Sequence, residues 1–140
     1  TSGGLTLVNM VVDIERIGDY CKNISDLTLL KNGPMDFGEL AKDIKSIEDE
    51  VSSRFSETIN IIQNQDESLA NKLLTSHKKL VTKVSDEIVS NIASGNIKFN
   101  DSAQSASIVL YARYLKRIGA HLKNITSTII NPYDRIGYNQ

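Results

Sequence analysis

The fold is decided by the stretch Leu115-Lys116-Arg117-Ile118-Gly119-Ala120-His121-Leu122-Lys123-Asn124-Ile125, which has an earlier copy near the start of the chain. That copy reads Ile14-Glu15-Arg16-Ile17-Gly18-Asp19-Tyr20-Cys21-Lys22-Asn23-Ile24. Six of the eleven aligned positions are identical, at a constant offset of 101 residues. Self-similarity at a fixed distance predicts a duplicated structural unit.

The two copies differ at the positions that would carry chemistry. Glu15 and Asp19 of the first copy are replaced by Lys116 and Ala120 in the second. Two carboxylates one helical turn apart can share a hard cation, or can bind iron or manganese together with a neighbouring helix. A solvated acidic pair beside Arg16 is the competing interpretation. Two acids on one helix therefore predict half of a metal site at most.

Glycine occupies the same place in both copies, as Gly18 and Gly119, although glycine inside a helix costs about 1 kcal/mol relative to alanine. We expect close helix packing there, with room for a ligand as the alternative. His121 stands at the equivalent of Tyr20 and has no acid at positions 116 and 120, so we expect a structural role or a partner contact. The other motif residues expected to serve the structure are Arg16, Asn23, Arg117 and Asn124.

Composition sets broad limits on the protein. A chain of 140 residues can bury one sizeable core, and its net charge of −1 gives no basic face for a nucleic acid. The single Cys21 excludes an internal disulfide, and no apolar run approaches the roughly 20 residues that cross a bilayer. The start Thr1-Ser2-Gly3-Gly4 is typical of a cloning remnant or of a cut through a longer protein.

Apolar residues recur in steps of three and four along most of the chain, which predicts four long helices, over 5–31, 36–62, 66–94 and 101–130. Asp36, Asp66 and either Asn100 or Asp101 are the expected N-caps. Short connections predict an all-α, antiparallel, up-down bundle of these four helices. The first helix carries extra apolar residues and is expected to pack on two sides. Its predicted buried stripe is Met10, Ile14, Ile17, Cys21 and Ile24.

Catalytic signatures are missing from the sequence. It has no Gly-rich phosphate loop, no CxxC and no HExxH, so we expect no enzyme. His77 lies on an apolar stripe and is expected to be a core or interface histidine rather than a ligand. A carboxylate-bridged metalloenzyme in a four-helix bundle is an alternative, but it needs acids on several facing helices, often with Glu-x-x-His.

Residues 13–24, Asp13-Ile14-Glu15-Arg16-Ile17-Gly18-Asp19-Tyr20-Cys21-Lys22-Asn23-Ile24, resemble the signature helix of the PhoU family of phosphate-uptake regulators, which reads approximately D-L-E-R-I-G-D-H-x-x-N-I. That family has two three-helix repeats, each ending in such a helix. The resemblance implies one PhoU-like domain over 1–140. Residues 1–31 would be the signature helix of an incomplete first repeat, 36–131 a complete second repeat, and 132–140 a tail.

Residues 115–125, followed by Asn131-Pro132-Tyr133-Asp134-Arg135-Ile136-Gly137-Tyr138, resemble the C-terminus of bacterial sodium/phosphate cotransporters, which carry a PhoU-like cytoplasmic domain. This implies a regulatory domain at the cytoplasmic face of the cell membrane that modulates phosphate uptake through helix-bundle contacts. Its partners would be its own transporter membrane domain or other phosphate-transport components, and a homo-oligomer is a further expectation. The alternative is a free-standing PhoU-type regulator of an ABC phosphate transporter and its sensor kinase.

PhoU proteins can bind multinuclear iron or other metals through pairs of E(D)xxxD motifs. By resemblance, Glu15 and Asp19 match the signature half of the first site, whose partner helix would precede Thr1. The second site is then expected to be lost, and no cofactor is expected in this chain unless another helix completes a divalent-metal site at Glu15 and Asp19. The four positions of that second site are not acidic: His77, Val81, Lys116 and Ala120.

Overall fold

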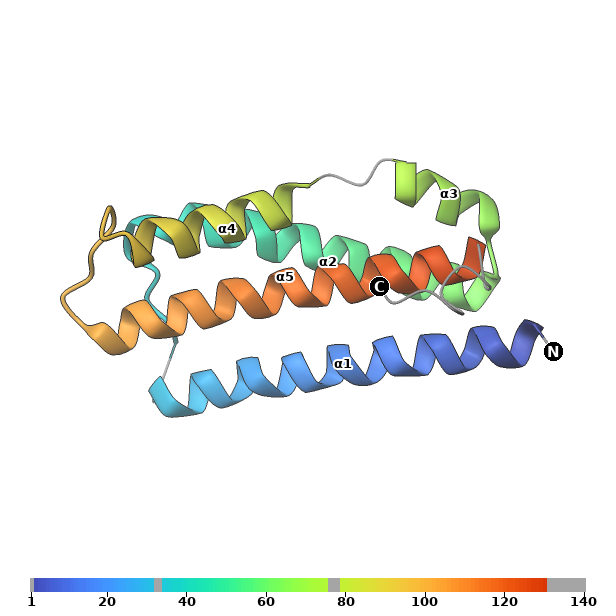
Figure 1. Ribbon diagram of the computed structural model, residues 1–140, viewed down its shortest axis with the longest axis horizontal. Coiled ribbons are helices and arrows are strands. Elements are labelled where there is room, and N and C mark those ends of the chain that lie inside the picture. Colours follow the sequence, from blue (N-terminus) through green and yellow to red (C-terminus); the bar gives the residue numbers. More distant parts are fainter. Residues whose placement is uncertain (1, 32–33, 76–78, 131–140) are drawn as a thin grey trace.

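The computed structural model describes residues 2–31, 34–75 and 79–130, which are helical with short connections and contain no strand (Figure 1). This confirms the predicted all-α class. Within that part of the chain, none of the helices is long and apolar enough to cross a membrane. The elements are α1 (Ser2–Lys31), the 3-10 turn η1 (Gly38–Leu40), α2 (Ala41–Asn64), α3 (Glu67–Thr75), α4 (Leu80–Ala93) and α5 (Ser102–Ile130).

The described residues form five α-helices where four were predicted. The expected third helix over 66–94 is divided into α3 and α4, and residues 76–78 between them, including His77, lie outside the described part. In Figure 1, α2 and α5 run in one direction, and α1, α3 and α4 run in the opposite direction. Helix α5 is central, because it packs against α1, α2, α3 and α4. Helix α1 packs chiefly on α5, so the predicted four-helix bundle is not closed between α1 and α2.

Polar side chains mark where the helices begin. Asp66 Oδ1 accepts a hydrogen bond from the Leu69 amide at 3.0 Å, which confirms the predicted cap before α3. Asp101 Oδ1 accepts one from the Ala103 amide at 2.9 Å, so Asp101, rather than Asn100, caps α5. Asp36, the expected cap of the second helix, accepts a hydrogen bond from the Gly38 amide at 2.9 Å through its Oδ1. The turn that follows it is the 3-10 turn η1, and α2 begins only at Ala41.

The core lies where α2, α4 and α5 meet. Helix α1 adds Met10, Ile17 and Leu27 to the buried apolar residues. Its predicted stripe is wrong at Ile14, which is 49% exposed, and at Cys21, which is also exposed. The buried face of α1 is turned toward Asp13, because α5 covers that side of the helix. The fully buried isoleucines of the core are Ile44, Ile47, Ile61, Ile88, Ile108 and Ile125.

Candidate functional site

The two copies of the duplicated motif pack against each other, on α1 and α5. Asp13 of α1 is 1% exposed, and its Oδ1 shares a hydrogen bond with Nδ1 of His121, on α5, at 2.9 Å. A buried carboxylate must be hydrogen-bonded to remain in the interior, so His121 has a structural role at this interface. The sequence predicted a structural role or a partner contact for His121, but not its hydrogen bond to Asp13, which is 108 residues away.

The duplication extends to the contacts between the two helices. The 101-residue offset makes Tyr114 the counterpart of Asp13, and His121 the counterpart of Tyr20. The rings of Tyr20 and Tyr114 lie 5.9 Å apart, centroid to centroid. Equivalent positions therefore meet twice, once as the Asp13–His121 hydrogen bond and once as a tyrosine pair. This pattern indicates an approximate twofold relation between α1 and α5.

Further contacts join the two pairs into one cluster. The Tyr20 ring stacks on the His121 ring with centroids 6.0 Å apart, and Arg117 Nε donates to the Tyr20 hydroxyl at 3.3 Å. Of the other motif residues, Arg16 is exposed, whereas Asn23 and Asn124 are half-buried. The backbone carbonyl of Asn124 accepts a hydrogen bond from the Thr128 hydroxyl at 2.8 Å. The motif residues on α1 and α5 thus include both interface contacts and positions away from the interface.

Glu15 and Asp19 are both exposed, on the side of α1 that faces away from α5. In residues 2–31, 34–75 and 79–130, no group of three or more His, Cys, Asp or Glu side chains is placed to hold a metal ion. The pair therefore offers two acidic ligands from one helix, whereas hard cations take six or more oxygen ligands. A half-site at Glu15 and Asp19 therefore stays a prediction.

Three of the four positions of the expected second metal site line one cavity of about 170 Å³, and the fourth, His77, lies outside the described residues. These three are Val81, Lys116 and Ala120. Arg54 and Lys123 line the same cavity. Because like charges repel, a cavity bordered by cationic side chains does not fit a metal cation. The three positions thus share one cavity, and the charge of its lining is not suited to a metal.

The two motif glycines have different surroundings. A Cβ added at Gly119 would meet Val81 Cγ1 at 3.8 Å, which is ordinary contact, and one added at Gly18 would meet nothing within 4 Å. Among the described residues, therefore, no neighbouring helix packs so closely on Gly18 or Gly119 that alanine would not fit there. Gly119 does line the cavity beside Lys116, which favours the alternative interpretation of room for a ligand.

The outer face of α1 is apolar and uncovered. Leu7, Val11 and Ile14 are 62%, 41% and 49% exposed. At the 101-residue offset, each of them is aligned with a buried residue of α5. The exposed Gly18 and Cys21 are likewise aligned with buried residues of α5. Between this helix and α2 lies an apolar cavity of about 200 Å³ that Ile14 and Phe55 help to line. The buried α5 counterparts are Ile108, Ala112, Leu115, Gly119 and Leu122.

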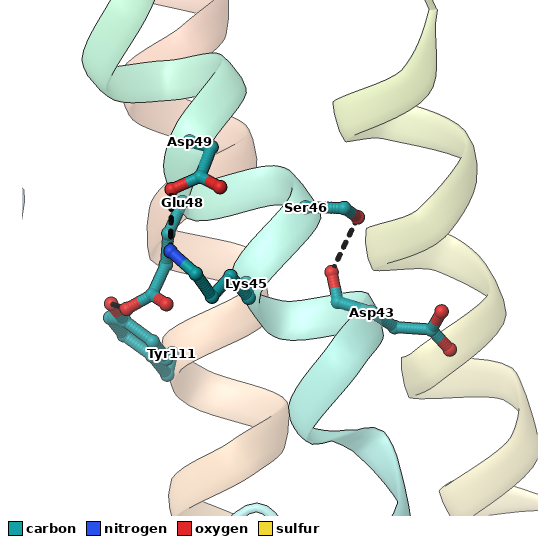
Figure 2. Close-up of polar contacts among 6 residues, drawn as sticks. All are labelled: Asp43, Lys45, Ser46, Glu48, Asp49 and Tyr111. Carbon is teal, nitrogen blue, oxygen red and sulfur yellow. Dashed lines mark hydrogen bonds and ion pairs between the residues drawn. The ribbon is translucent and has the colours of Figure 1, made fainter.

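A polar contact also connects α5 to α2. Figure 2 shows the Tyr111 ring beside Glu48, and the Tyr111 hydroxyl donates to Glu48 Oε2. Burial, together with this hydrogen bond and the Glu48 charge, raises the pKa of Tyr111 above its usual range. The Phe37 ring stacks on the Tyr111 ring at 5.6 Å. This cluster anchors the segment before η1 to the helices and has the character of a structural contact.

One comparison with known proteins identifies a family. A family model described as a PhoU domain matches residues 38–129, about two thirds of the chain. The matched range extends from η1 to near the end of α5 and leaves out α1. Neither the curated proteins nor the solved structures give a match.

Proposed function

The chain belongs to the PhoU domain family, and on that premise we propose that it is a regulatory domain of a sodium-dependent phosphate transporter. Membership in the family indicates a regulatory role in phosphate transport, and PhoU domains are regulatory rather than enzymatic. In this proposal the domain modulates phosphate uptake through contacts between helices, at the cytoplasmic face of the membrane. Its partner is the transporter's own membrane domain.

The observation that carries the proposal is the pairing of the duplicated motif on α1 and α5. Helix α1 lies outside the matched range, yet it repeats the α5 motif and packs along α5 through the Asp13–His121 hydrogen bond. We therefore propose that α1 belongs to the same domain. The cotransporter assignment is supported by the resemblance of residues 115–125 and 131–138 to cotransporter C-termini; residues 131–138 lie outside the described part of the chain.

The same duplication supports a proposal for the domain organisation. We propose that α1 is the signature helix of a first repeat, and that α2 to α5 form the complete second repeat. The first repeat would then contain two more helices, one equivalent to α2 and the other equivalent to α3 and α4 together. These two helices would cover the outer face of α1. This is supported by the exposure of Leu7, Val11 and Ile14, whose α5 counterparts are buried. If those helices carry acids, they would complete a divalent-metal site at Glu15 and Asp19.

Phosphate uptake in cells that carry the gene tests this function. Labelled phosphate uptake is measured with sodium and with sodium replaced by choline, before and after deletion of the coding region for residues 1–140. We expect the deletion to change the sodium-dependent component and to leave the sodium-independent component unchanged. A change confined to the sodium-independent, ATP-driven component would instead indicate a free-standing regulator of an ABC transporter. No change in either component contradicts both assignments.

A matched pair of surface variants then tests the covering helices. Val11→Glu adds a charge to the outer face of α1, whereas Glu87→Gln changes the exposed surface of α4. Val11→Glu is expected to alter sodium-dependent uptake in the full-length protein, and Glu87→Gln is not. Light scattering of the 140-residue chain is the second measurement. A dimer that Val11→Glu converts to monomer would show that a second copy covers this face.

A further inference from the structure

The cavity between α2, α4 and α5 carries cationic side chains from two of its three helices. Arg54 comes from α2, and Lys116 and Lys123 come from α5. Thr82 of α4 contributes a hydroxyl group to the same lining. The cavity volume of about 170 Å³ is large enough for several water molecules or a small ion. None of these four side chains is needed to explain the packing of the duplicated helices.

Arg54 is the strongest pointer to a ligand. Its side chain is 7% exposed, and its Nε donates to Glu50 Oε1 at 3.0 Å. Within the described part of the chain, the guanidinium group makes no hydrogen bond besides this one. A guanidinium carries five N–H donors in a planar fork, so the donors on the two Nη atoms remain for a ligand. Arg54 lines the cavity, so these donors can bind an oxygen-rich anion there.

Two lysines add positive charge around the same space. Lys116 Nζ is 2.7 Å from Asp86 Oδ1 and keeps two further N–H donors. Lys123 is exposed and forms no ion pair within residues 2–31, 34–75 and 79–130. The three cations therefore exceed the two carboxylates paired with them, Glu50 and Asp86. The cavity has an excess of positive charge and of hydrogen-bond donors.

We propose that this cavity binds a phosphate group, either inorganic phosphate or the terminal group of a phosphate monoester. The donors come from three helices and so approach the cavity from several directions. A tetrahedral oxyanion presents acceptor oxygens in several directions, whereas a carboxylate presents two oxygens in one plane. Arg54 supplies a fork suited to two oxygens, and the lysines supply charge. Gly119 borders the cavity without a side chain and leaves room for the anion.

The proposal assigns a ligand of opposite charge to the place where the family resemblance implies a metal. The residues there are Val81, Lys116 and Ala120, and none of them can replace a carboxylate ligand. This inference goes beyond the proposed function and does not rest on it, because it is argued from the lining of the cavity alone. If the domain regulates its transporter without binding phosphate, the uptake experiment still gives its expected result and only the binding experiment fails.

Isothermal titration of the 140-residue chain tests the site, with inorganic phosphate in one arm and phenyl phosphate in the other. We expect saturable binding of one molecule per chain in at least one arm, weakened by added sodium chloride because exposed Lys123 is screened by salt. Saturation by inorganic phosphate alone identifies the free ion. Tighter binding of phenyl phosphate identifies a phosphorylated molecule. Equal affinity for sulfate, or no saturation in either arm, overturns the proposal.

Variants locate the binding. Lys123→Gln and Thr82→Val change exposed side chains at the cavity, and each is expected to weaken phosphate binding, Lys123→Gln by about tenfold. The control is Lys45→Gln, because Lys45 is 73% exposed, pairs with Asp49 on α2 and lies outside this lining (Figure 2). Arg54→Lys should weaken binding further, provided that circular dichroism shows a folded chain. If Lys45→Gln weakens binding as much as Lys123→Gln, the anion binds elsewhere and the assignment is wrong.

Discussion

Asp13 Oδ1 and His121 Nδ1 lie 2.9 Å apart, and these two residues join the two copies of a duplicated helix. Their counterparts, Tyr114 and Tyr20, face each other with ring centroids 5.9 Å apart. One contact is polar and the other aromatic, although both connect the same two motif positions. The duplication has thus kept the geometry of the interface while the chemistry of its two halves diverged.

Loss of the His121 ring should destabilise the chain. His121→Ala removes one hydrogen-bond partner from a carboxylate that is 1% exposed, and we expect a fall in the free energy of unfolding of about 1–3 kcal/mol. Urea denaturation followed by circular dichroism measures it. Tyr20→Phe is the matched control, because it removes only the exposed, 3.3 Å contact to Arg117 and should cost about 0.5 kcal/mol or less. Equal losses would show that the Asp13–His121 bond contributes little.

The same truncation at duplicated positions should have unequal effects. Leu115 is 6% exposed and Ile14 is 49% exposed. We expect Leu115→Ala to lower the free energy of unfolding by about 2–5 kcal/mol, and Ile14→Ala by about 1 kcal/mol or less, because water already reaches half of that side chain. Chemical denaturation of the two variants measures the difference. A comparable loss at Ile14 would mean that its face is covered in solution, for instance by a second copy.

Stability should fall at high pH through Tyr111. Its pKa is raised in the folded chain, so ionisation of the unfolded chain, above the ordinary value of 10.0, favours unfolding. The stabilising contribution is complete below pH 10 and is lost as the pH rises toward the folded-state pKa. Tyr111→Phe should remove this part of the pH dependence, at a cost of about 1 kcal/mol at neutral pH. Thermal unfolding of both proteins across pH 7 to 11.5 would show no difference in slope if burial and the Glu48 contact did not keep the phenol neutral.

Alanine at Gly18 should stabilise the 140-residue chain. The position is helical and a Cβ there would meet nothing within 4 Å, so Gly18→Ala should raise the free energy of unfolding by up to about 1 kcal/mol through helix propensity. Urea denaturation measures the gain. Gly119→Ala is the comparison, because a Cβ there would meet Val81 Cγ1 at 3.8 Å. A loss at Gly18 would indicate that another helix packs closely on it in solution.

Local signals predicted much of the fold. The three-and-four spacing located the helices, and the short polar side chains of Asp66 and Asp101 marked two of their starts. The prediction failed where local pattern was ambiguous. Helix α1 is apolar on more than one side, so its periodicity could not choose between the face of Ile14 and the face of Asp13. The position of α5 made that choice, because it covers the Asp13 side.

The candidate sites divide in the same way. The acidic pair Glu15 and Asp19, and the non-acidic Lys116 and Ala120, could be identified by aligning the two copies of the motif. The contribution of Arg54 could not, because it is 62 residues from Lys116 in the chain and lies on a different helix. Nothing in its own helix distinguishes it from a solvated arginine, and only the tertiary structure places it in one cavity lining with Lys116.

The sequence by itself determined the duplication, the helical class and the absence of acidic side chains at positions 116 and 120 of the second copy. These are properties of residue type and spacing along one helix, where neighbours are three or four positions apart. The tertiary structure alone decided which face of α1 is buried, that His121 meets Asp13, and that three cations border one cavity. Those contacts join residues 62 to 108 positions apart, and they depend on how the helices lie side by side.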